Sequence, residues 1–374
     1  MTESATQSLR FQVQNKEQRQ FYATLNKRVN QFFKDQQLSK KANTEMVVKT
    51  IIFITAYVGG FGLILALQPG WSLSLVLWGI MGLAISGIGM SIMHDAIHGA
   101  YSKKDWVNRL MGYTLNLAGG ATINWYWQHN YLHHTYTNIT DWDEDIENKG
   151  ALKFSPHTKT NWFHKLQQVY AFFFYGLLTL YWVIGKDFVQ FFRYTKNGVN
   201  KYSRRMTQLI FLQIVMLKIA YFAVFFYVPI YLVGIPTAQV IVGFLLMHFI
   251  AGVVLTVIFQ LAHSVEGTDH PMPDEEGNIQ NAWAIHEMST TVNFATENRL
   301  LSWYVGGLNY QVEHHLFPHI CHVHYPKIAP IVRETAEEYG VPYMVNDTLQ
   351  GAIRSHLKLL ARYGELPSMD EAIV

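Results

Sequence analysis

Residues 306–318 read Gly-Gly-Leu-Asn-Tyr-Gln-Val-Glu-His-His-Leu-Phe-Pro, and their histidine pair is the last of three histidine clusters in the chain. The clusters are His94 and His98, then His129, His133 and His134, and finally His314 and His315. Residues four apart on a helix lie on one face, so the spaced histidines of the first two clusters can point at one ion. If the three clusters meet in space, they form a site for more than one metal ion.

The chain supplies more ligands than one structural metal ion needs. The clusters hold seven histidines, Gln311 lies three residues before His314, and His263 adds another histidine outside the clusters. Neutral imidazole is a common ligand of iron, copper and zinc. The set suffices for two ions with open coordination positions, which points to iron and oxygen chemistry, although ligand preference by itself leaves zinc open.

Long uncharged runs place the chain among membrane proteins. Of its 374 residues 50% are apolar and only 15% are charged. Four runs are long enough to cross a bilayer as helices: 47–68, 73–93, 210–233 and 237–262. Short turns at 69–71 and 234–236 join them in pairs, and Lys218 is a charge inside the third. We therefore predict an all-α integral membrane protein with four transmembrane helices in two hairpins and a cytoplasmic helical cap that holds the metal site.

Two shorter apolar stretches, 110–123 and 170–185, are ambiguous. Histidine clusters that share one site must lie on one face of the membrane, so an even number of crossings separates them. We therefore expect both stretches to lie in the interface or within the bundle rather than to cross.

The basic residues predict the orientation of the chain. Eight lysines and arginines precede the first span and Lys49 lies at its start, whereas the two hairpin turns carry none. By the positive-inside rule both termini and all three clusters face the cytoplasm. The net charge of +2 comes with no basic stripe, so we expect no nucleic-acid partner.

The remaining segments divide the chain into 1–46, a membrane domain over 47–330, and 331–374. We expect residues 1–15 to be disordered, and 17–34 to form an amphipathic helix that lies either on the membrane or on the cytoplasmic domain. Two helices are predicted near the C-terminus, 328–338 and 348–363, the second capped by Asp347. The acidic run 141–147 is either a solvated loop or a source of hydrogen bonds to ligand histidines.

The three clusters, in this order and spacing, resemble the histidine motifs of the membrane fatty acid desaturase superfamily. Gln311, where most members carry histidine, is the mark of the front-end branch. The resemblance covers about residues 47–330. It implies metal ligation by His94, His98, His129, His133, His134, His314 and His315, with Gln311 beside them and His263 as the ligand outside the motifs. The stearoyl branch has asparagine one turn before the extra histidine, where this chain has Phe259.

The resemblance also implies the chemistry. Two iron ions and O2 would introduce a cis double bond between an existing one and the carboxyl end of an acyl chain, carried on coenzyme A or on a lipid. Residues 1–46 lack the His-Pro-Gly-Gly haem motif of a fused cytochrome b5 domain, so a separate donor is expected, either a ferredoxin or free cytochrome b5. The alternatives are a hydroxylase, methyl-end or sphingolipid desaturase of the same superfamily, and more distantly a metal-binding membrane transporter.

Overall fold

The computed structural model describes residues 9–147 and 150–367, and they divide into two compact units. The membrane unit consists of Asn43–Trp127 and Phe172–Val257. The histidine unit is drawn from Met1–Ala42, Gln128–Ala171 and Ile258–Val374. The predicted division of the chain at residues 46 and 330 follows sequence order and stays a prediction.

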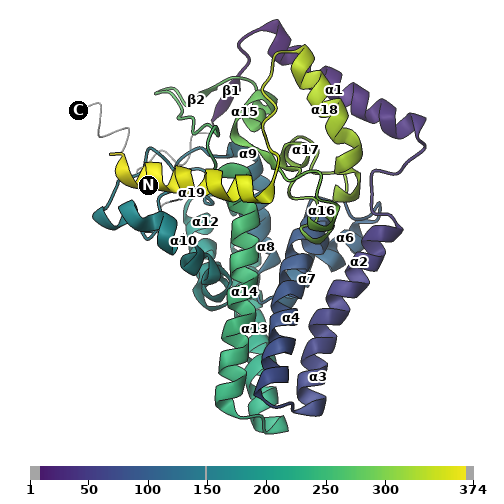
Figure 1. Ribbon diagram of the computed structural model, residues 1–374, viewed down its shortest axis with the longest axis vertical. Coiled ribbons are helices and arrows are strands. Elements are labelled where there is room, and N and C mark those ends of the chain that lie inside the picture. The colour runs from purple at the N-terminus through teal and green to yellow at the C-terminus, as the bar shows by residue number, and fades with distance from the viewer. Residues whose placement is uncertain (1–8, 148–149, 368–374) are drawn as a thin grey trace. The chain divides into compact units, whose positions relative to one another are not determined.

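The four predicted spans are confirmed as long apolar helical runs, Thr44–Leu67, Trp71–Ile97, Arg204–Val233 and Thr237–His263. The first consists of α2 (Thr44–Ile54), the π-helical η2 (Thr55–Gly59) and α3 (Gly60–Leu67), and the second of α4 (Trp71–Gly87), the π-helical η3 (Ile88–Met93) and α5 (His94–Ile97). The third consists of α13 (Arg204–Phe222) and the π-helical η7 (Ala223–Val233), and α14 (Thr237–His263) forms the fourth. Figure 1 shows α3 beside α4, as a hairpin requires.

Small residues and buried hydrogen bonds join the helices of the membrane unit. A Cβ atom on Gly243 of α14 would lie 2.1 Å from the Trp78 indole of α4, so only glycine permits this approach. His248 of α14 lies 3.0 Å from the Tyr221 hydroxyl of α13 and 3.2 Å from Thr179 Oγ1 of α11 (Leu178–Tyr181). His248 thus hydrogen-bonds between helices.

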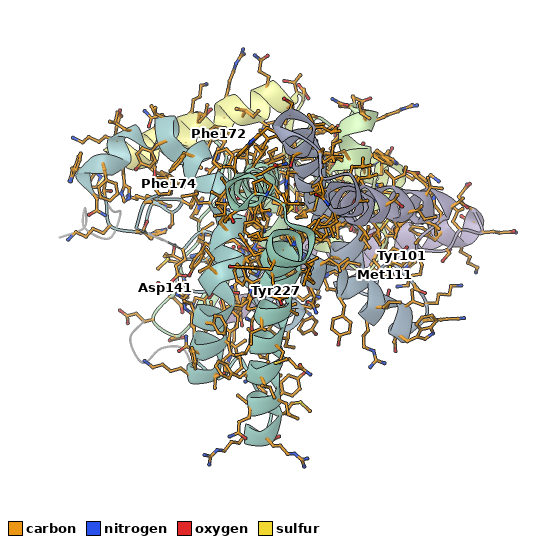
Figure 2. The ribbon with its side chains drawn as sticks, turned by 90° about the horizontal axis from the view of Figure 1, so that it is seen from below. Tyr101, Met111, Asp141, Phe172, Phe174 and Tyr227 are labelled. Atoms are coloured by element: carbon orange, nitrogen blue, oxygen red, sulfur yellow. The ribbon has the colours of Figure 1, made fainter. Side chains whose placement is uncertain are left out.

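The stretch 110–123 is split among helices too short to span, namely α6 (Asp105–Gly112), α7 (Thr114–Leu117) and α8 (Thr122–Trp125). The stretch 170–185 belongs to a helical run over Trp162–Gly176 and Leu178–Lys196 that bends by 50° at the break. This run comprises the 3-10 turn η5 (Trp162–Leu166), α10 (Gln167–Gly176), α11, the π-helical η6 (Trp182–Lys186) and α12 (Asp187–Lys196). Figure 2 labels Phe172 and the exposed Phe174 on α10. That the run does not cross the membrane stays a prediction.

Helix α1 (Lys16–Asp35) confirms the predicted helix at 17–34, and its apolar face is buried within the histidine unit. That face consists of Phe21, Leu25, Val29 and Phe33, which share a core with α17 (Gln311–Leu316) and α18 (Tyr325–Glu338). Because the face is already covered by protein, the packed alternative is favoured over a membrane-surface helix.

Short parallel strand pairs join distant parts of the histidine unit. β1 (Arg10–Gln12) pairs with β2 (Asn278–Gln280), and β3 (Asn293–Phe294) pairs with β4 (Val345–Asn346). The expected disorder of residues 1–15 is therefore wrong for β1, because its backbone is held by β2; residues 1–8 lie outside the described part of the chain.

The remaining helices of the histidine unit are α9 (His134–Tyr136), α15 (Trp283–Thr290), α16 (Arg299–Tyr304), the 3-10 turn η8 (His322–His324) and α19 (Leu349–Glu365). The two C-terminal helices appear as predicted, with one correction. The cap of α19 is Thr348, whose Oγ1 accepts a hydrogen bond from Gly351 N at 3.0 Å, rather than Asp347. The helix begins one residue later than predicted, which places Thr348 at the capping position.

Candidate metal centre

A double-glycine turn sets the direction of the third histidine motif. Gly306 and Gly307 adopt positive φ values of 63° and 65°, a backbone conformation that residues other than glycine rarely adopt. A Cβ atom on Gly307 would lie 2.9 Å from the Cβ of His322. The turn leads into the short helix α17, which carries Gln311, His314 and His315, all three buried.

The second motif begins on a π-helical segment, η4 (Tyr126–His133), and its last histidine, His134, begins α9. A π-turn is wider than an α-turn, so residues four and five apart come to lie near one another on one side. The ring centroids of His129 lie 5.4 Å from His133 and 4.7 Å from His134. The three buried imidazoles of this motif therefore face one region.

The histidine unit brings five of the predicted histidines together in two overlapping groups. His133, His263 and His315 form the first group, whose potential ligand nitrogens all lie within 4.8 Å of one another. His134, His314 and His315 meet the same criterion. All five are buried, and His315 belongs to both groups. The rings come from η4, α9, the end of α14 and α17, so the chain folds back on itself to assemble them.

Hydrogen bonds at Nδ1 orient the rings of the first group. His133 Nδ1 lies 3.0 Å from Asp143 Oδ2, and His315 Nδ1 lies 2.7 Å from Glu287 Oε2. His263 Nδ1 lies 3.3 Å from the carbonyl oxygen of Thr290. An N–H that donates to such an acceptor leaves the Nε2 lone pair of the same ring available to a metal ion.

The surroundings of two of these Nε2 atoms show whether the group fits a metal ion. Nε2 of His133 and Nε2 of His263 are buried and have no hydrogen-bond partner among the described residues. A buried polar atom in that state is costly unless a ligand satisfies it. Imidazole nitrogens are donors that iron, copper and zinc accept, so this group fits a first-row metal ion.

The acidic run 141–147 contributes one hydrogen-bonding carboxylate to this group. Asp143 is buried and also accepts a hydrogen bond from Asn138 N at 2.9 Å. Burial by itself lowers the pKa of His133, but the charges of Asp143, Asp145 and Glu287 outweigh burial and raise it to about 9. The negative potential that favours a protonated imidazole also favours a metal cation at the same place.

Glu287 was not predicted from the sequence. It lies on α15, is fully buried, and accepts a hydrogen bond from Thr137 Oγ1 at 3.0 Å besides facing His315. Burial raises the pKa of Glu287 well above its usual range. A bound divalent cation acts in the opposite direction, because it favours the ionised carboxyl. No motif marks this residue, since a single glutamate on a short helix resembles an ordinary surface charge.

Phe259 and Gln311 complete the surroundings of His263. The Phe259 ring centroid lies 5.0 Å from that of His133 and 5.0 Å from that of His263, so an apolar ring occupies the position of the stearoyl-branch asparagine. The Gln311 side chain interacts with His263. The amide is thus beside the histidines, as the resemblance implied.

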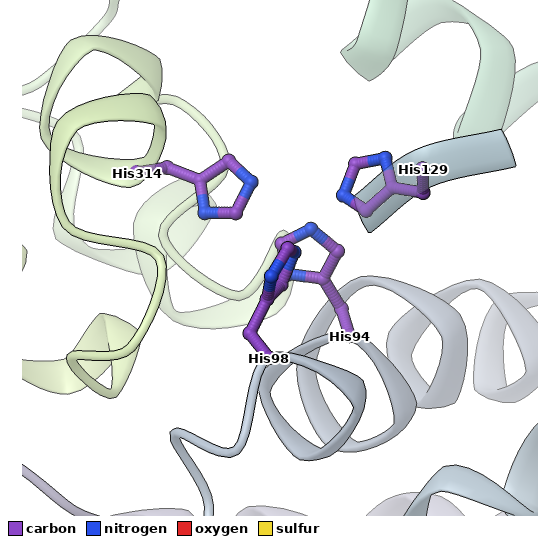
Figure 3. Close-up of side chains that lie close together, drawn as sticks. All are labelled: His94, His98, His129 and His314. Carbon is purple, nitrogen blue, oxygen red and sulfur yellow. The ribbon is translucent and has the colours of Figure 1, made fainter. Parts of the chain in front are cut away.

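The first motif belongs to the membrane unit. His94 begins α5 and His98 follows its last residue, with their ring centroids 4.9 Å apart. Figure 3 shows these two rings projecting from one helix end. It also shows His129 and His314 of the histidine unit, whose rings stack with centroids 5.9 Å apart.

A helical protein with several membrane-spanning helices and clustered, buried histidines oriented by carboxylates has the features of a membrane-bound metalloenzyme. The chain matches the fatty acid desaturase family over residues 69–346 and belongs to that family, as the three motifs predicted.

Three curated relatives are similar to the chain. A sn-1 linoleoyl-lipid 6-desaturase of Arthrospira platensis is 36% identical over 91% of this chain and 92% of its own length. Another sn-1 linoleoyl-lipid 6-desaturase, of Synechocystis sp., is 33% identical over 93% of this chain and 97% of its own. An acyl-lipid (8-3)-desaturase of Physcomitrium patens is 32% identical over 93% of this chain and 72% of its own.

Proposed function

We propose that this chain is an oxygen-dependent front-end desaturase that introduces a cis double bond into the acyl chain of a lipid. Membership of the fatty acid desaturase family makes it an oxidoreductase. The assignment to the front-end branch rests on Gln311 in the third motif. It is supported by relatives named for desaturation at carbon 6 of a linoleoyl chain. Linoleoyl chains carry their existing double bonds farther from the carboxyl end, so such an enzyme acts on the carboxyl side of them.

The acyl carrier is proposed to be a lipid rather than coenzyme A. The relatives from Arthrospira, Synechocystis and Physcomitrium are all named for acyl groups on lipids. A substrate of this kind reaches the enzyme within the bilayer, which suits a protein with four apolar spans.

Two iron ions are proposed as the metals. His133, His263 and His315 would hold one ion, with Gln311 beside it. His94 and His98 are proposed to hold the other with His129, His134 and His314; this rests on the order of the family motifs and on the mutual proximity of the rings within each unit. When bound, the iron pair supplies reductive activation of O2 and the removal of hydrogen from an unactivated methylene.

The residues of the chain itself orient and shield the site. The Nδ1 hydrogen bonds of His133 and His315 hold the imidazoles in one tautomer and one direction. Phe259 covers the rings of His133 and His263 with apolar surface, which excludes water from the region. The substrate chain must then be held with one methylene beside the metals.

Sidedness and electron supply complete the proposal. Both termini and the metal site face the cytoplasm, because eight lysines and arginines precede the first span and the two hairpin turns carry none. A ferredoxin or free cytochrome b5 delivers the electrons there.

The test is expression in a host fed linoleate or alpha-linolenate, with double bonds located by gas chromatography and mass spectrometry after derivatisation. A new double bond on the carboxyl side of the existing ones is expected. A hydroxylated product would favour the hydroxylase alternative, and a bond on the methyl side would overturn the front-end assignment.

The ligand set is tested in the same host. His133→Ala and His315→Ala should abolish the product and lower the iron content of the purified protein. His157→Ala is the matched control, because His157 bonds to the carbonyl oxygen of His270 at 2.9 Å and lies outside the motifs. Full iron content and product in His133→Ala would remove His133 from the ligand set.

A further inference from the structure

Lys218 is a charged residue within the third membrane helix, and it is almost fully buried. Ionisable side chains inside a membrane are costly and are functional candidates by default. The Nζ atom of Lys218 donates to Asp187 Oδ2 at 2.6 Å, to the carbonyl oxygen of Gly119 at 2.6 Å and to that of Trp182 at 2.9 Å. These acceptors use all three donor positions of the ammonium group.

Asp187 at the start of α12 is the centre of the same network and has no exposed surface. Its carboxylate accepts hydrogen bonds from Trp182 Nε1 at 3.0 Å, from Ala121 N at 2.9 Å and from Asn124 Nδ2 at 3.3 Å. Its carbonyl oxygen also accepts from Asn124 Nδ2, at 2.7 Å. The ion pair therefore fastens α13, the η6–α12 region and the segment 119–124 to one another.

This network holds a buried apolar cluster next to the first histidine motif. The Trp182 ring centroid lies 5.1 Å from that of Trp125, and Trp182 shares a buried cluster with Met93 and Leu115, against which Ile97 packs. Met93 directly precedes His94, and Ile97 directly precedes His98. Met93 and Ile97 thus link the cluster to the stretch of helix that carries the first motif.

An acyl chain offers no polar group near the carbons that react, and its successive methylenes are chemically alike. Hydrogen bonds cannot select one of them, so the shape of an apolar wall must decide which methylene stops beside the metals. Such a wall selects well only if it cannot move, and a saturated buried network supplies that rigidity.

We infer that the buried Asp187–Lys218 pair is a positioning device for the acyl chain. By holding Trp182 and the segment 119–125, it fixes the wall beside His94 and His98 and so sets the position of the new double bond. The inference rests on the proposed desaturase function. Neither residue takes part in the chemistry; both act through the wall.

The experiment compares Lys218→Met with wild-type protein, and the readout is the position of the double bond rather than the yield. Lys218→Met removes the hydrogen bonds to the carbonyl oxygens of Gly119 and Trp182. We therefore expect the apolar wall formed by Trp182 and the segment 119–125 to move. We expect the ratio of product at the wild-type position to product at displaced positions to fall by about tenfold to a hundredfold, the effect of a displacement near 1 Å. Lys218→Arg, which keeps the charge and the donors, should retain the wild-type position.

Two further variants keep the test decisive if Lys218→Met fails to fold. Asp187→Asn/Lys218→Met removes both charges together, which avoids an unpaired buried charge. Trp182→Phe removes only the indole N–H to Asp187 and part of the wall. Both should displace the double bond. The matched control is Gln239→Leu, which deletes a partly buried hydrogen bond to the Pro69 carbonyl oxygen in the turn between α3 and α4.

The outcomes separate the inference from the function on which it rests. Product only at the wild-type position in Trp182→Phe and in the double variant, with yield falling in step with folded protein, would make the pair merely structural. Wild-type protein that forms no new double bond would instead overturn the proposed function.

Discussion

A histidine binds a metal ion through one ring nitrogen, and the partner of the other nitrogen decides which one faces the ion. Asp143 and Glu287 fill this role for His133 and His315. Both carboxylates are buried, so each acts in a medium where an electrostatic interaction is stronger than in water. Their removal should therefore weaken metal binding without touching a ligand.

Glu287→Gln is the first prediction at this scale. The amide keeps the size of the side chain but loses the charge that faces His315 and Thr137. We expect iron affinity to fall by about tenfold to a hundredfold, as for other partners of metal ligands. The measurement is iron retained per chain after dialysis against a graded chelator. Glu266→Gln, at an exposed ion pair with Lys358, is the control and should retain iron like wild-type protein.

Asp143→Asn tests the second partner within the acidic run. Loss of the carboxylate removes the hydrogen-bond acceptor of His133 Nδ1 and of Asn138 N, so we expect a loss of iron of similar size, about tenfold to a hundredfold in affinity. Asp141→Asn is the matched control, because Asp141 is exposed and asparagine tolerates its φ of 70°. Equal iron retention in the two variants would mean that Asp143 does not orient the ligand.

At the scale of elements, the turn before α17 carries a prediction about folding. Gly307→Ala must adopt a left-handed conformation, which costs about 1 to 2 kcal/mol, and its Cβ must also displace His322. We expect a lower melting temperature and a lower iron content. Gly340→Ala has a φ of 63° with open space around the new Cβ, so it isolates the conformational cost. A Gly307→Ala protein as stable and as iron-rich as Gly340→Ala would contradict the proposed role of the turn.

The helices that the sequence predicted are those with a clear apolar pattern. Helix α1 and the four spans appear where hydrophobic spacing and length placed them. The π-helical segments η3 and η4 were not predicted, because an extra residue in a turn leaves the hydrophobic pattern almost unchanged. The cap of α19 was missed by one residue since Asp347 and Thr348 both suit that position.

The site residues also differ in how far the sequence could predict them, because some are marked by local spacing and others are brought in only by the tertiary fold. The histidines were recognisable because the ligand spacing is local. The acidic run 141–147 drew attention because it follows the second motif closely, but its sequence did not single out Asp143 or exclude a solvated loop. Glu287 and the Thr290 carbonyl oxygen reach the site only through the tertiary fold. Neither has a neighbouring motif, so no rule of spacing could assign them.

At the scale of the whole molecule, the parity of the spans decides on which side of the membrane each loop lies. The proposal places both termini in the cytoplasm and lets the bent run Trp162–Lys196 remain on that side. The chain has a single cysteine, Cys321, which is buried, so Cys321→Ala gives a background without thiols. New cysteines at exposed positions then report sidedness through a membrane-impermeant maleimide.

We expect Ser72→Cys and Thr237→Cys, each directly after a hairpin turn, to react in intact cells, because the proposed topology places both turns outside. Lys27→Cys, Lys201→Cys and Arg354→Cys should react only after the membrane is permeabilised. Lys201 is the decisive position, since it follows the bent run and precedes α13. Labelling of Lys201→Cys in intact cells would mean that the bent run crosses the membrane. The histidine clusters before and after the run could then share one site only if another span were re-entrant.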